Sequence, residues 1–169
     1  MAQSKAATAK APAPVVGKMT GRIPALKRAP SDPANGYRLG ARSFLAGVRA
    51  LSTTSSIDEL FSCHLLAAFA LECAYKSYIA RAGAPDVARA GGHDLVRLSR
   101  DAEARGFAVP HEFDFEIGVL QQLSTGPHFY VRYRSGADGA ALITGPVLLM
   151  IVEDVVNKME AAMVRKATP

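Results

Sequence analysis

The sequence predicts an all-α protein, a mostly antiparallel bundle of four or five helices that follows a disordered N-terminal tail. Apolar residues recur at helical spacing in several stretches joined by short loops. Only residues 128–134 alternate as a strand would, and no second strand is available to pair with them. The composition agrees, because 49% apolar residues can fill a core while 7% aromatics and no Trp favour aliphatic packing. A length of 169 residues suits one domain with a tail.

Residues 1–35 are rich in Ala, Lys and Pro, and we expect them to be disordered because they bury too little apolar area to offset their ordering entropy. The first 31 residues hold no acid and six basic side chains, which are Lys5, Lys10, Lys18, Arg22, Lys27 and Arg28. The remainder has 14 basic and 15 acidic residues. The pI of about 9.4 therefore belongs to the tail and indicates no basic face on the fold.

Three interpretations of the tail stay open. Its charge would suit electrostatic, sequence-independent contact with nucleic acid, with an affinity that falls steeply with salt. It would equally suit a solubilising segment. A transit peptide is the third interpretation, although five prolines disfavour the amphipathic helix that such a peptide forms.

The first helix is expected over residues 37–51. Its apolar positions form a single stripe, made of Tyr37, Ala41, Phe44, Leu45, Val48 and Leu51. A Ser-Thr loop follows at residues 52–56. That loop ends in a predicted capping box, with Ser56 as the N-cap and Glu59 three residues later.

The second helix, from residue 57 to a stop near Gly83, is expected to be the centre of the bundle. Between Cys63 and Ala74 it carries only two strongly polar side chains, so it is apolar on nearly all sides. An unpaired carboxylate there would be costly, so Glu72 is predicted to pair with Lys76 and with Arg132.

The two cysteines, Cys63 and Cys73, are expected to be buried thiols in a reducing compartment. They would lie ten residues apart on one helix, roughly 15 Å by rise, which exceeds the reach of a disulfide. Their spacing matches no zinc motif, and the paired glycines at 91–92 lack the Lys and Ser/Thr of a phosphate-binding loop. We expect neither a metal nor a cofactor.

Three further helices complete the predicted bundle of residues 36–166. A loop over residues 85–92 leads to a third helix from Leu95 to Gly106, and a fourth runs over residues 112–123. The last helix runs over residues 145–166 with Pro146 at its first position. The longest apolar run, residues 147–152, is far shorter than the roughly 18 residues of a membrane span. With no secretory pattern either, a cytoplasmic protein is expected.

Polar residues recur in a particular order along these helices. The pattern is His64-x7-Glu72-x3-Lys76, then Gly-His93-Asp-Leu, and finally Phe-Tyr-Val-Arg132-Tyr133. In this order and spacing, residues 37–163 resemble the HEPN family (higher eukaryotes and prokaryotes nucleotide-binding domain). The resemblance implies a helical bundle that forms a homodimer. Independently of the resemblance, we predict either a structural polar cluster or a ligand site formed by His64, Glu72, Lys76, His93, Arg132 and Tyr133.

The resemblance also implies two functions. The family includes metal-independent RNases of toxin and antiviral systems, which use an Arg-x4–6-His motif at a helix start. Here no histidine follows Arg132, so we expect a non-catalytic module that associates with RNA, a nucleotide or a protein partner in a defence or stress system. The alternative is an endoribonuclease, in which Arg105 with His111, or His128 with Arg132, would act and His would transfer the proton.

Overall fold

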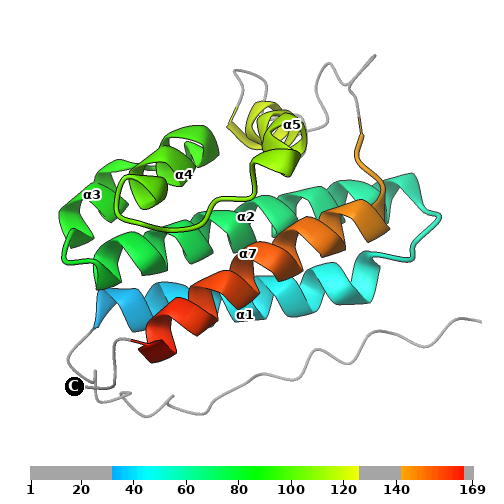
Figure 1. Cartoon of the computed structure of the whole chain (residues 1–169). Coiled ribbons are helices and arrows are strands. Elements are labelled where there is room, and N and C mark those ends of the chain that lie inside the picture. Colours follow the sequence, from blue (N-terminus) through cyan, green and yellow to red (C-terminus); the bar gives the residue numbers. More distant parts are fainter. Residues whose placement is uncertain (1–31, 126–141, 166–169) are drawn as a thin grey trace, which may run out of the picture.

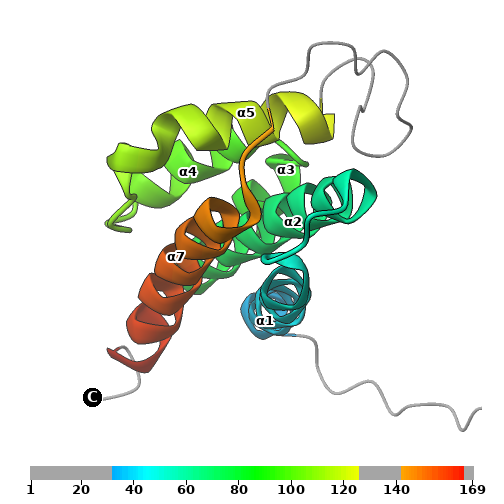
Figure 2. The same ribbon diagram turned by 90° about the vertical axis from the view of Figure 1, so that its right-hand side faces the viewer.

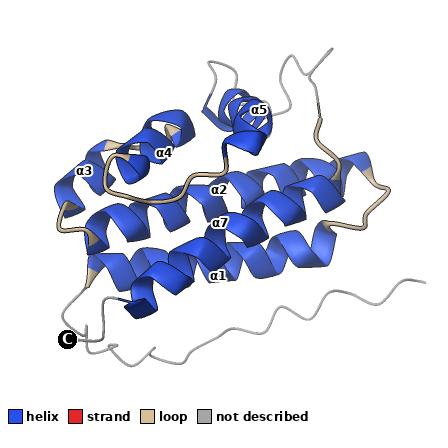
Figure 3. Ribbon diagram, viewed as in Figure 1, coloured by secondary structure: helices blue, strands red, loops and turns tan. Residues whose placement is uncertain are grey.

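The computed structural model describes residues 32–125 and 142–165 of the chain. Its helices are α1 (Pro33–Leu51), α2 (Ile57–Arg81), α3 (Pro85–Ala90), α4 (Leu95–Glu103), the 3₁₀ turn η1 (His111–Phe113), α5 (Asp114–Thr125) and α7 (Gly145–Arg165). Those residues contain no strand (Figure 3). The predicted all-α fold is confirmed.

Helix α2 is the centre of the bundle, as its apolar pattern predicts. It contacts α1, α3, α4, α5 and α7. Figure 1 shows α1, α2 and α7 lying alongside one another, with α3, α4 and α5 gathered over α2. In the turned view of Figure 2, α1 and the α4–α5 pair lie on opposite sides of α2. Burial on several sides explains why α2 lacks a polar face.

Helix α1 begins at Pro33, four residues before its predicted start. The Asp32 carboxylate caps it by accepting the Ala34 N–H at 3.0 Å, and Pro33 suits the first helical position because it has no N–H to satisfy. Residues 33–35, predicted as tail, are therefore helical. The remainder of the predicted tail, residues 1–31, lies outside the described residues.

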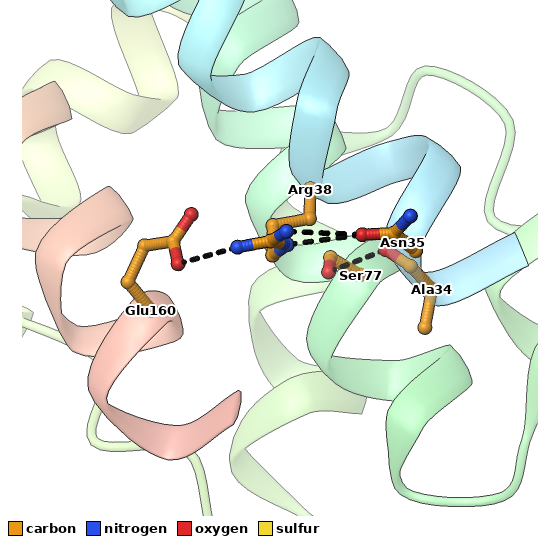
Figure 4. A network of polar contacts seen from close by, with 5 residues as sticks. All are labelled: Ala34, Asn35, Arg38, Ser77 and Glu160. Atoms are coloured by element: carbon orange, nitrogen blue, oxygen red, sulfur yellow. Dashed lines mark hydrogen bonds and ion pairs between the residues drawn. The ribbon is translucent and has the colours of Figure 1, made fainter. Parts of the chain in front are cut away.

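Polar contacts hold the first turns of α1 against α2 and α7 (Figure 4). The Ser77 hydroxyl of α2 donates to the Ala34 carbonyl at 2.8 Å. The Arg38 guanidinium donates to Asn35 Oδ1 and lies 3.1 Å from the Glu160 carboxylate of α7. These tertiary contacts stabilise the first turn of α1, which the apolar stripe alone does not predict.

The predicted capping box at the start of α2 is wrong in its detail. Ser56 is the N-cap residue, but its side chain makes no capping hydrogen bond. The Thr54 hydroxyl instead donates to the Glu59 carboxylate and accepts the Ser56 N–H at 3.1 Å. The Thr54 hydroxyl therefore bridges the Ser56 N–H and the Glu59 carboxylate in place of the predicted capping box.

The segment between α2 and α4 also differs from its prediction. Residues 85–90 were expected as a loop but form α3, which begins with a proline and buries Ala88. Helix α4 ends at Glu103 instead of Gly106, whose φ of +88° turns the chain after the helix. The fourth predicted helix divides into η1 and α5, and the last begins as predicted and ends at Arg165.

Helix α7 enters the bundle through a very close backbone approach. A Cβ atom built on Gly145 would lie 2.2 Å from the Ser52 carbonyl oxygen at the end of α1. Only glycine fits at this crossing, which places α7 beside α1 and α2.

Candidate functional site

Glu72 lies in the bundle and is paired, as predicted. Glu72 is 8% exposed and Lys76 is 7% exposed. The Lys76 ammonium donates to Glu72 Oε1 at 2.7 Å, one helical turn away. The Lys76 Nζ atom also lies 5.8 Å from the centre of the Tyr37 ring on α1. These contacts explain how α2 carries two charges among apolar neighbours.

The second oxygen of the Glu72 carboxylate, Oε2, connects the Glu72–Lys76 pair to the surface. His93 Nδ1 lies 2.8 Å from Glu72 Oε2, and the His93 side chain is 55% exposed. His93 directly precedes Asp94, the N-cap of α4, whose carboxylate accepts the Arg97 N–H at 2.9 Å. A capped helix start therefore holds the imidazole against Glu72. We call Glu72, Lys76 and His93 the Glu72 cluster.

An aromatic surface borders the Glu72 cluster. The centre of the Phe69 ring lies 6.4 Å from that of His93 and 5.3 Å from that of Phe44. Among the described residues, this half-exposed imidazole makes its polar contact through Nδ1, so its Nε2 could meet a ligand. The cluster can therefore offer a proton donor or acceptor beside an apolar surface.

His64, predicted for the same cluster, has a separate role. It is fully buried, its Nδ1 lies 2.8 Å from the Leu60 carbonyl, and its Nε2 accepts the Ile143 N–H at 2.9 Å. Burial lowers the pKa of this imidazole. The partners assign a neutral ring with the proton on Nδ1, which joins α2 to the chain leading into α7. Sequence reasoning missed Ile143, because a backbone N–H leaves no mark in the sequence.

Arg105 and His111 are each held by other groups. Arg105 Nη1 donates to the Asp101 carbonyl at 2.6 Å. His111 Nε2 lies 2.8 Å from Glu103 Oε1, and its Nδ1 lies 3.2 Å from Asp114 Oδ2. Hydrogen bonds to Glu103 and Asp114 raise the pKa of this exposed imidazole. Both ring nitrogens of His111 are thus occupied by carboxylates.

Several predicted site residues lie outside the described residues. They are His128, Arg132 and Tyr133 between α5 and α7, and Lys5, Lys10, Lys18, Arg22, Lys27 and Arg28 before α1. The predicted contact between Arg132 and Glu72 stays a prediction. Within the described part, Lys76 and His93 are the groups that hold the carboxylate.

The two cysteines are free thiols, as predicted. Cys63 is fully buried and Cys73 partly buried, and burial raises the pKa of both. Burial, with the neighbouring Glu72 carboxylate, raises the pKa of Cys73 to about 11. At neutral pH both thiols stay protonated and are therefore poor nucleophiles.

The fold and the Glu72 cluster define an all-α bundle whose buried ion pair reaches the surface through one histidine. Comparison with protein-family models, with curated proteins and with solved structures finds no match to this chain. Among the described helices, none is long and apolar enough to cross a membrane. Residues 32–125 and 142–165 contain no group of three or more His, Cys, Asp or Glu side chains placed to hold a metal ion.

Proposed function

We propose that this chain is a HEPN-like module of the cytoplasm that binds RNA or a nucleotide without cleaving it, as part of a defence or stress system. One observation carries the proposal, the contact between His93 and Glu72 at the surface end of a buried ion pair. Lys76 and Glu72 balance each other in charge, and the half-exposed His93 ring adds a hydrogen-bonding group at the surface end of the pair. The half-exposed His93 ring would supply a face on which a base can stack.

The test for this function is binding of a fluorescently labelled single-stranded RNA, measured by anisotropy without added metal. We expect the parent chain to bind the RNA and leave it intact. His93→Gln keeps a donor that can reach Glu72 but removes the imidazole, and it should weaken binding. Arg42→Gln, on the exposed surface of α1, is the matched control and should bind as the parent does.

A chain that lacks residues 1–31 separates the tail from the Glu72 cluster. The deletion leaves Asp32, the N-cap of α1, in place. If the cluster is the site, the shortened chain still binds RNA, and its binding still depends on His93. Loss of all binding with the tail would instead assign RNA contact to the six basic residues. A parent chain that binds no RNA or nucleotide contradicts the proposal.

An endoribonuclease is the second candidate, and the Glu72 cluster gives a specific reason for it. The Glu72 carboxylate lies 2.8 Å from Nδ1 of the half-exposed His93 ring and can orient that ring, as carboxylates do in other acid–base pairs. Metal-free cleavage of labelled RNA that disappears in His93→Gln would favour this candidate. Cleavage lost in Arg105→Ala and His111→Ala would place the reaction at that motif, although both residues have other partners here.

We also propose that the chain acts as a homodimer. The support is the family resemblance together with Phe115 on α5, which is 75% exposed. Sedimentation equilibrium of the parent should give twice the chain mass, and Phe115→Asp should shift the equilibrium towards the monomer. A parent that sediments as a monomer at every concentration contradicts this part of the proposal.

A further inference from the structure

A cavity of about 400 Å³ is lined by residues that do not belong to the Glu72 cluster. The last turn of α2, the loop after α4 and the C-terminal half of α7 line it, and it opens to solvent. Its walls are mainly aromatic and alanine side chains, including Tyr78, Phe107 and Ala162. This volume falls within the range of small-molecule sites in proteins.

The aromatic wall of the cavity is fixed by packing. The Tyr78 and Phe107 rings lie 4.9 Å apart between centres, and Tyr75 meets Phe107 edge-on at 5.8 Å. The Tyr78 hydroxyl donates to the Arg105 carbonyl at 3.0 Å, which holds the loop onto α2. Gly106, with its positive φ, turns the chain so that the buried Phe107 follows directly. A wall held in this way needs little reordering when a ligand binds.

The charged residues that line the cavity are both cations. Arg81 is exposed, and its guanidinium makes no ion pair within the described residues. Lys158 Nζ lies 2.7 Å from Asp154 Oδ2 on the same helix and keeps two further N–H donors. Of the residues that the structure describes, no carboxylate side chain lines this cavity. An apolar wall beside a guanidinium that has no ion-pair partner in the described part of the chain suits a ligand that combines an apolar body with an anionic end.

We propose that this cavity binds a small monocarboxylate with an apolar body. The carboxylate would pair with the Arg81 guanidinium, which can donate two parallel hydrogen bonds, and the apolar body would lie against Phe107 and Tyr78. The chain's own N-terminal segment does not suit this site by charge, because residues 1–31 carry six basic side chains and no acid. The site shares no residue with the Glu72 cluster, so it stands independently of the proposed function.

The test compares octanoate with 1-octanol, which has the same apolar chain without the charge. Calorimetric titration of the full chain should give one saturable site for octanoate, with 1-octanol about tenfold weaker. In amide NMR spectra, octanoate should shift the resonances of Gly106, Phe107 and Ala108 and leave that of His93 in place. Equal affinity for the two ligands, or shifts confined to other residues, overturns the proposal.

Two variants and a control locate the contacts. Arg81→Gln should weaken octanoate about tenfold and leave 1-octanol unchanged, because only the charged contact is lost. Ala162→Leu should weaken both ligands by filling the cavity, and its thermal unfolding establishes that it is folded. Arg42→Gln, on α1, should match the parent. If Arg42→Gln weakens octanoate as much as Arg81→Gln, the attraction is general and the proposed contact is wrong.

Discussion

The Nε2 atom of His64 accepts the backbone N–H of Ile143 at 2.9 Å, so a neutral imidazole joins α2 to the chain that enters α7. Because burial lowers its pKa, the folded protein binds a proton at His64 less readily than the unfolded chain does. The stability from this contact is fully present above the unfolded pKa, about 6.5. It is lost as the pH falls below that value towards the lower folded pKa.

His64→Leu should reveal this pH dependence. The free energy of unfolding, measured in urea at pH 7.5 and at pH 5.5, should fall more for the parent than for the variant. At pH 7.5 the variant itself should be less stable by about 2 kcal/mol, because the Ile143 N–H loses its acceptor. An equal fall in parent and variant would mean that other groups cause the acid sensitivity.

Gly145→Ala should destabilise the bundle strongly. The added Cβ would lie 2.2 Å from the Ser52 carbonyl oxygen, so α7 would have to move away from the end of α1. We expect a loss of about 3 kcal/mol in the free energy of unfolding, at the upper end of the range for overpacking. Gly118→Ala is the matched control, because its Cβ in α5 would meet nothing within 4 Å. It should gain about 0.5–1 kcal/mol from helix propensity, and equal losses in both variants would refute the steric argument.

The helices that the sequence predicted correctly are those whose pattern of apolar residues is visible over a short stretch of chain. The stripe of α1 and the apolar surroundings of α2 follow from residue spacing, because a helix repeats over a few residues. Helix α3 was missed since it is only six residues long and two glycines follow it; burial of Ala88 is a tertiary effect. The start of α1 was missed although Asp32 and Pro33 are a local helix-start signal, because the prediction followed the apolar stripe; the Ser77 and Glu160 contacts that hold this turn lie far along the chain.

The candidate site was predicted in part for the same reason. Glu72 and Lys76 are one helical turn apart, so their pairing was readable from the sequence. His93 was assigned to the same cluster, but its direct contact with Glu72 depends on how α4 packs against α2. His64 was grouped with them because it shares their helix, whereas its partners are backbone atoms. The spacing of residue types along the chain does not predict hydrogen bonds to backbone atoms that are distant in sequence.

Removing one member of the buried Glu72–Lys76 pair should cost more than replacing both. Glu72 is 8% exposed, and Lys76→Met leaves its carboxylate with His93 as the one remaining partner among the described residues. The variant should lower the free energy of unfolding by about 3 kcal/mol. Adding Glu72→Leu removes the stranded charge and should recover most of that loss. Urea unfolding of both single variants and the double variant gives the coupling energy. A double variant whose losses simply add would contradict a direct pair.

His111 should titrate above the ordinary histidine pKa. The hydrogen bond to Glu103 is the largest cause and the one to Asp114 the next, and both favour the protonated ring. A raised folded pKa means that the stability it contributes is present below the unfolded pKa and is lost as the pH rises through the folded pKa. NMR titration of the His111 ring should therefore give a midpoint above about 6.5.

Glu103→Gln should lower that midpoint more than Asp114→Asn does, and added salt should lower it too. Glu112→Gln, a neighbouring exposed carboxylate, is the control. A midpoint unchanged by Glu103→Gln would mean that His111 is not held by Glu103 in solution, which would free its Nε2 for the proton transfer that the Arg105–His111 hypothesis requires.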